Sequence, residues 1–98
     1  MIVHIVLFKW KEEATSASIT ATIEALKDLQ SKIPQIIDLS CGENFTERAQ
    51  GFHHGLVVKF STRNDLEAYQ NHEAHQEVVQ NLIKPILADI IALDYETE

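Results

Sequence analysis

Three side chains near the end of the sequence, Tyr69, His72 and His75, have the types and the spacing that acid–base chemistry requires. A stripe of residues at i, i+3, i+7 and i+10, which a helix turns towards its core, runs from His72 through His75 to Leu82. An imidazole on that face needs a hydrogen-bond partner or a polar cavity, because a buried polar group without one costs roughly 1–3 kcal/mol. Since imidazole gives and takes protons near neutral pH, the segment indicates a cavity suited to proton transfer.

A single straight helix cannot bring all of these groups to one ligand. Tyr69 and His75 would lie about 120° apart around its axis, so they can face one ligand only if the helix breaks between them. Asn71 is a residue type that caps a new helical segment. We therefore expect the helix to break at Asn71.

The preceding residues predict the elements that position this segment. Ile2 to Trp10 is rich in β-branched and aromatic residues and is typical of a strand buried on both faces. Helical spacing of apolar residues predicts a helix from about Ser16 to Lys32, which Pro34 ends. Alternation predicts a second strand from Ile36 to Phe45, and Phe52 to Phe60 is the third.

The remaining residues predict a second helix and a fourth strand. Thr62 and Asp65 resemble a capping box that opens a helix at Arg63. Pro85 ends the helical region, and Leu87 to Tyr95 is the fourth strand. The order βαββαβ predicts an α+β, ferredoxin-like fold, a four-stranded antiparallel sheet with both helices on one face. We expect residues 1–98 to form a single domain.

Alternation along the strands predicts two different sheet faces. The face away from the helices would be largely apolar and would carry Val3, Ile5, Leu7, Val57, Leu87, Ile91 and Leu93. Such a patch is rarely left in water, so we expect a homodimer that closes two sheets into an α/β barrel. The face beneath the helices would line a pocket together with Tyr69, His72 and His75, and it would carry His4, Val6, Phe8, His54, Leu56, Val58 and Asp94.

Composition excludes several function classes. A net charge of −7, with no basic cluster, argues against binding to nucleic acid or to an anionic membrane surface. The apolar opening run is too short for a membrane span and lacks a cleavage site. Cys41 is the only cysteine, which suits a reducing compartment. We therefore expect a cytoplasmic protein.

Four segments together carry a family resemblance. They are IVHIVLFKW at residues 2–10, GFHH at residues 51–54, Tyr69-x-x-His72-x-x-His75, and the ending Leu93-Asp94-Tyr95. They resemble the stress-responsive α/β-barrel (Dabb) family, which includes olivetolic acid cyclase, and the resemblance covers essentially the whole chain. It implies a small dimeric ferredoxin-like barrel.

The resemblance also implies roles for individual residues. It places a catalytic tyrosine at Tyr69, a catalytic histidine at His75, and further pocket groups at His4, His54 and Asp94. Other positions depart from the pattern. Glu73 replaces a common proline, Ile23 and Leu26 replace aromatic residues of the cyclase pocket, and Ile37 stands where the cyclase has lysine. The acid–base groups are retained while the substrate-shaping groups are not.

Three functions fit these residues. The first is a lyase- or cyclase-type enzyme acting on a small carbonyl compound, with His75 as general base, Tyr69 as hydrogen-bond donor to the oxyanion, and His4 or Asp94 orienting His75. The second is a non-catalytic dimeric module for a hydrophobic ligand, and the third is a cofactor-free monooxygenase of the same fold. We expect no cofactor and no metal, because scattered histidines without carboxylates or thiolates are a weak metal signal.

Overall fold

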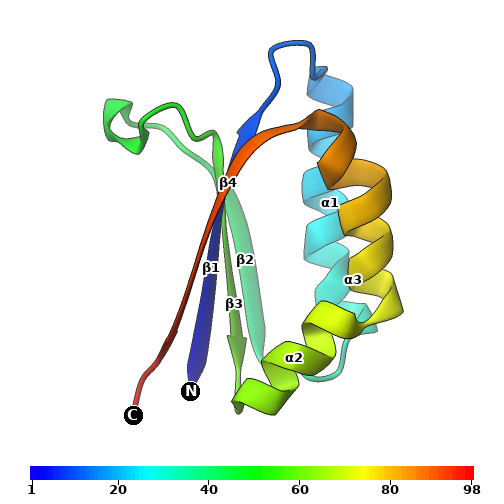
Figure 1. Ribbon diagram of the computed structural model, residues 1–98, viewed down its shortest axis with the longest axis vertical. Helices are drawn as coiled ribbons and strands as arrows, with labels where there is room; N and C mark the ends of the chain where they lie inside the picture. The colour runs from blue at the N-terminus through cyan, green and yellow to red at the C-terminus, as the bar shows by residue number, and fades with distance from the viewer.

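The computed structural model describes all 98 residues and contains one four-stranded sheet with helices against one face (Figure 1). The helices and strands in chain order are β1 (Ile2–Trp10), α1 (Ser16–Lys32), β2 (Asp38–Glu43), β3 (His54–Phe60), α2 (Arg63–Asn71), α3 (Glu73–Val78) and β4 (Leu87–Glu96). Each pair of neighbouring strands is antiparallel, and the strands lie in the order β2-β3-β1-β4. This is the predicted ferredoxin-like βαββαβ fold.

Local signals account for the helix boundaries. The side chain of Thr15 accepts a hydrogen bond from the backbone N–H of Ser18 at the start of α1, and the helix ends two residues before Pro34. The side chain of Thr62 accepts from the N–H of Asp65 and so opens α2 at Arg63, as predicted. Capping therefore fixes where both long helical segments begin.

Strands β2 and β3 are shorter than predicted. The predicted strand from Ile36 to Phe45 extends only over Asp38–Glu43, and β3 begins at His54. Just after β2 the backbone N–H of Asn44 still donates to the carbonyl of His53 at 2.8 Å, while its side chain donates to the carbonyl of Thr46 at 2.7 Å and forms a local turn. Gln50 and Gly51 then adopt positive φ angles of 54° and 86°, which no strand residue has.

The strand register separates the two faces of the sheet. His4 pairs with Val58 and Asp94, and Val6 pairs with Leu56 and Ala92, so these residues lie on the face beneath the helices. The fully buried residues of the core are Phe8, Thr22, Leu26, Leu29, Ile33, Val58, Phe60 and Tyr69.

One residue lies on the other face from the one predicted. The register of β1 with β4 shifts between Lys9 and Trp10, so that Trp10 pairs with Leu87. This bulge inserts one residue and reverses the alternation. Leu87 therefore faces the helices and not the outer surface, where its odd position in the sequence had placed it.

The outer face of the sheet is apolar, and no α-helix covers it. Figure 1 shows α1, α2 and α3 on one side of the sheet, whereas the loop with the short 3-10 turn Glu47–Ala49 projects on the other. Ile91, Leu93 and Tyr95 on β4 are 48%, 56% and 45% exposed, and Ile5 and Val57 continue the same row of side chains across β1 and β3. No helix of the protein has both the length and the apolar character needed to cross a membrane.

Candidate active site

His72 breaks the helical region that carries the candidate residues. Its backbone is extended, with φ −66° and ψ 137°, and it lies between the end of α2 and the start of α3. Its Nδ1 accepts a hydrogen bond from the N–H of Ala74 at 3.0 Å and so caps α3. The break was predicted at Asn71, where α2 ends, but His72 supplies the cap. The change of direction brings the rings of Tyr69 and His75 to a centroid distance of 4.4 Å.

A cavity of about 320 Å³ lies between these segments and the sheet. Its apolar lining comes from Val6, Phe8, Leu26, Leu56, Val79, Ile83, Leu87, Ile90 and Ala92, and its polar lining from His4, Tyr69, Gln70, His75 and Lys84. A mostly apolar cavity with a few convergent polar groups is typical of a small-molecule site.

Tyr69 is the most deeply buried polar side chain of this cavity. It is 0% exposed, and its hydroxyl has no hydrogen-bond partner within the protein. Its ring packs against those of Phe60 and His4 at centroid distances of 5.1 and 6.0 Å. Burial raises the pKa of Tyr69, so the phenol stays protonated and is a hydrogen-bond donor in need of an acceptor.

His75 is held in one orientation by the backbone. Its Nδ1 lies 3.2 Å from the carbonyl oxygen of Gln70, and only an N–H can donate to that oxygen, so the neutral ring carries its proton on Nδ1 and leaves Nε2 as an acceptor. Burial lowers the pKa of His75, and the Gln70 hydrogen bond partly offsets the shift. Either His4 or Asp94 was expected to orient this ring, but the Gln70 carbonyl hydrogen-bonds it.

The lowered pKa of His75 also links stability to pH. Between the lowered value and the ordinary value of about 6.5, the unfolded chain binds more protons than the folded one. The free energy of unfolding therefore falls as pH decreases through that range. Neutral His75 is thus the form that the folded protein favours.

His4 and Asp94 form a pair on the sheet side of the cavity. They lie opposite each other on β1 and β4, and the Nδ1 of His4 hydrogen-bonds the Oδ1 of Asp94. The His4 side chain is buried, whereas that of Asp94 is 40% exposed. Of this pair, His4 alone lines the cavity, so Asp94 can influence the cavity only through His4.

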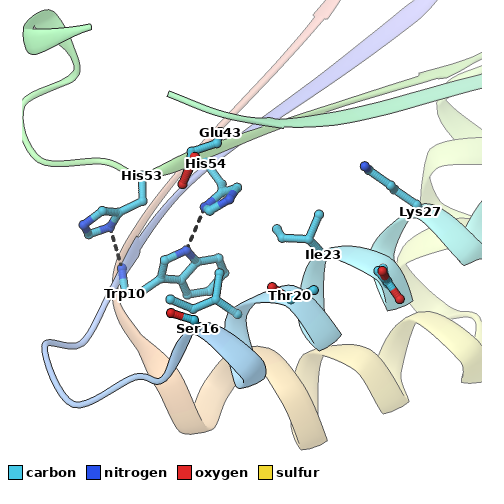
Figure 2. Close-up of a pocket in the computed structure, with 10 residues that line it drawn as sticks. Trp10, Ser16, Thr20, Ile23, Lys27, Glu43, His53 and His54 are labelled. Carbon is cyan, nitrogen blue, oxygen red and sulfur yellow. Dashed lines mark hydrogen bonds between the residues drawn. The ribbon is translucent and has the colours of Figure 1, made fainter. Parts of the chain in front are cut away.

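His54 lies in a different hollow, which Trp10 also lines (Figure 2). The indole Nε1 of Trp10 donates to the Nδ1 of His54 at 2.9 Å, and the backbone N–H of Trp10 donates to the Nδ1 of His53 at 3.1 Å. The Phe8 and Trp10 rings are stacked at 5.1 Å. This hollow, of about 390 Å³, is open and more polar than the cavity.

The structure thus corrects four of the expected pocket positions. His54 faces the Trp10 hollow, His72 caps α3, and Val58 is fully buried in the core. Asp94 contacts His4 from outside the lining. None of the four lines the cavity. The remaining expected residues, His4, Val6, Phe8, Leu56, Tyr69 and His75, do surround it.

Sequence reasoning missed Gln70 and Lys84. No pattern pointed to the Gln70 carbonyl, because its role depends on the helix break two residues later. Lys84 is the residue before Pro85, where a helix is expected to end, and this was a signal that the chain turns there. No group of three histidine, cysteine, aspartate or glutamate side chains lies close enough to hold a metal ion.

The Trp10–His54 hydrogen bond predicts a fluorescence titration. Trp10 is the only tryptophan, and protonation of His54 on Nδ1 removes its acceptor. Burial lowers the pKa of His54, while Glu43 opposes and His53 reinforces the shift; Glu24 and Lys27 also line the hollow. We expect tryptophan emission to change in one step centred below about 6.5.

Two variants assign this step. His54→Gln keeps an accepting oxygen at every pH and should abolish the step, whereas His53→Gln should retain it. An unchanged titration in His54→Gln would contradict the assignment.

Comparison with known proteins gives a family match over nearly the whole chain. Residues 2–97 match the family described as the stress responsive A/B barrel domain. The chain is 35% identical over 96 residues to a stress-response A/B barrel domain-containing protein of Arabidopsis thaliana, and the matched region covers 97% of this chain and 36% of the relative. The chain spans about a third to a half of the length of the curated relatives that it matches.

Two solved structures share the fold. A dimeric ferredoxin-like protein of unknown function from Thermobifida fusca superposes with a TM-score of 0.87 at 28% identity, over 98% of this chain and 90% of that one. A hydroxynitrile lyase from Passiflora edulis superposes with a TM-score of 0.88 at 22% identity, over 96% of this chain and 90% of that one. At that identity the second likeness shows the fold alone.

Proposed function

The chain belongs to the stress responsive A/B barrel domain family, and from this premise we propose that it binds a small carbonyl compound in the cavity and transfers a proton on it. One observation carries the proposal. The buried Tyr69 hydroxyl has no partner, and the His75 ring lies 4.4 Å away from the Tyr69 ring. A donor that needs an acceptor and a neutral base thus face the same apolar space.

The proposed step moves one proton. The Nε2 of His75 takes a proton from the carbon next to the carbonyl. The electron pair of the broken C–H bond forms a C=C bond, and the π pair of the carbonyl moves to its oxygen. The Tyr69 hydroxyl donates a hydrogen bond to that oxygen as it becomes negative. The imidazolium then returns its proton to the product, which balances the reaction without a cofactor. An isomerase needs this step alone, whereas a lyase or a cyclase would also break or form a C–C bond at the same enolate.

The fold neighbour from Passiflora edulis is a hydroxynitrile lyase, which supports this class. The alternative of a binding module without chemistry uses the same cavity and lacks only the proton transfer. Hydrogen exchange on a bound carbonyl compound separates the two.

We further propose that the protein is a homodimer in which the outer sheet faces of two copies pack together. The exposed row of Ile91, Leu93 and Tyr95 supports this assembly, because a contiguous apolar patch is rarely left in water. The Thermobifida fusca protein, which shares the fold, is dimeric. A cytoplasmic location fits the single cysteine, and residues 1–98 would form one domain.

Hydrogen exchange on carbon tests the proposed reaction. A panel of short aldehydes, ketones and 3-oxo compounds is first screened for binding by thermal shift, and the binders are incubated with the protein in D₂O. We expect proton NMR to show enzyme-dependent loss of the signal next to the carbonyl for at least one binder. Binding without exchange would leave the binding module, and the absence of any binder would overturn the cavity assignment.

A further inference from the structure

Lys84 stands at the mouth of the cavity on an unusual turn. Val79–Ile83 form a π-helical turn, and the N–H of Lys84 donates to the carbonyl of Val79, five residues back. Val79 and Ile83 from this turn line the cavity. Such wide turns are frequent at functional sites, and this one places an exposed lysine at the rim of an apolar space.

The charge of Lys84 is unpaired within the protein. The two ion pairs of the protein are His4–Asp94 and Arg63–Glu96, and Lys84 belongs to neither. The chain as a whole carries a net charge of −7. An anionic ligand is therefore repelled by most of the surface and attracted locally at this mouth.

We propose that the ligand of this cavity is an amphiphilic carboxylate, with its apolar chain inside and its carboxylate at the Lys84 ammonium. This inference rests on the proposed function and names its substrate class, a carbonyl compound that also bears a carboxylate. The carbonyl would meet the Tyr69 hydroxyl, which needs an acceptor, and the apolar lining would enclose the chain.

Cavity size sets the length of the ligand. A volume of about 320 Å³ holds about ten non-hydrogen atoms, at the roughly 30 Å³ that a water molecule occupies in the liquid. Octanoate has this size. Octanamide has the same shape and no charge, so the pair isolates the contribution of the carboxylate.

The test compares the affinities of octanoate and octanamide by calorimetry. We expect wild type to bind octanoate about three- to fivefold more tightly than octanamide, as an exposed ion pair provides. Lys84→Glu should lose or reverse this ratio. Lys32→Glu, which changes the net charge equally at the last turn of α1, away from the cavity, should keep it.

Each remaining outcome decides against one proposal. The carboxylate site is overturned if wild type binds octanoate and octanamide equally, or if it binds neither compound. It is also overturned if the affinity ratio is unchanged in Lys84→Glu. If the ratio depends on Lys84 but no carbonyl compound exchanges its hydrogen, the carboxylate site stands and the proton-transfer function fails. If exchange occurs but the octanoate-to-octanamide affinity ratio is the same in wild type and Lys84→Glu, the function stands and the carboxylate site fails.

Discussion

Replacing His75 by glutamine should lower the rate of hydrogen exchange on a bound carbonyl compound by about two to four orders of magnitude, the usual loss when a general base is removed. The amide of glutamine has no basic nitrogen to accept the proton, although its N–H can still donate to the Gln70 carbonyl. Tyr69→Phe should lower the same rate by about two to three orders of magnitude, because it removes the buried hydroxyl that donates a hydrogen bond to the developing oxyanion.

Stability distinguishes these losses from misfolding. The Tyr69 hydroxyl has no partner in the folded protein, so removing it should leave the melting temperature unchanged or slightly higher. His53→Gln, outside the cavity, is the control for rate. Exchange that persists in both cavity variants would show that other groups move the proton.

Leu93→Glu should convert the proposed dimer into a folded monomer. Leu93 is 56% exposed within one copy, so glutamate fits the isolated fold without strain. In a symmetric interface it buries two carboxylates, each at a desolvation cost of several kcal/mol. Sedimentation equilibrium at micromolar concentration should give twice the 11.1 kDa chain mass for wild type and one chain mass for the variant, with unchanged circular dichroism.

Ile37→Glu is the matched control for this experiment. Ile37 is also a half-exposed apolar residue, but it precedes β2 and lies outside the row that β4 presents. This variant should remain dimeric. A wild-type protein that sediments as a folded monomer would contradict the assembly.

Local signals in the sequence were sufficient to predict the fold. Helix α1 has the predicted bounds because Thr15 and Pro34 are both close to its ends, and the Thr62 cap fixes the start of α2. The order of elements follows, since short connections and alternating strands leave few arrangements. The sheet faces were predicted correctly up to Trp10, where the bulge reverses them.

The site was less predictable because it depends on long-range geometry. The proximity of Tyr69 and His75 required a break that the sequence signals, but the cap came from His72, one residue later than predicted. Alternation places His54 on the same sheet face as the cavity. The indole of Trp10, however, hydrogen-bonds it in a separate hollow. Parity reports a face of the sheet and not a position along it.

The strand order has a consequence for how the protein is made. The first strand lies between β3 and β4, so the pairing of His4 with Asp94 joins residues 90 positions apart in the chain. Contacts so distant in sequence form late and slow the folding of a domain, because loop closure costs entropy before any contact stabilises the fold. During synthesis β1 must wait for β4, which also brings Leu87, Ile90 and Ala92, the last wall of the cavity. A chain synthesised only as far as α3 lacks this wall of the cavity, so the site becomes able to bind only after β4 has joined the sheet.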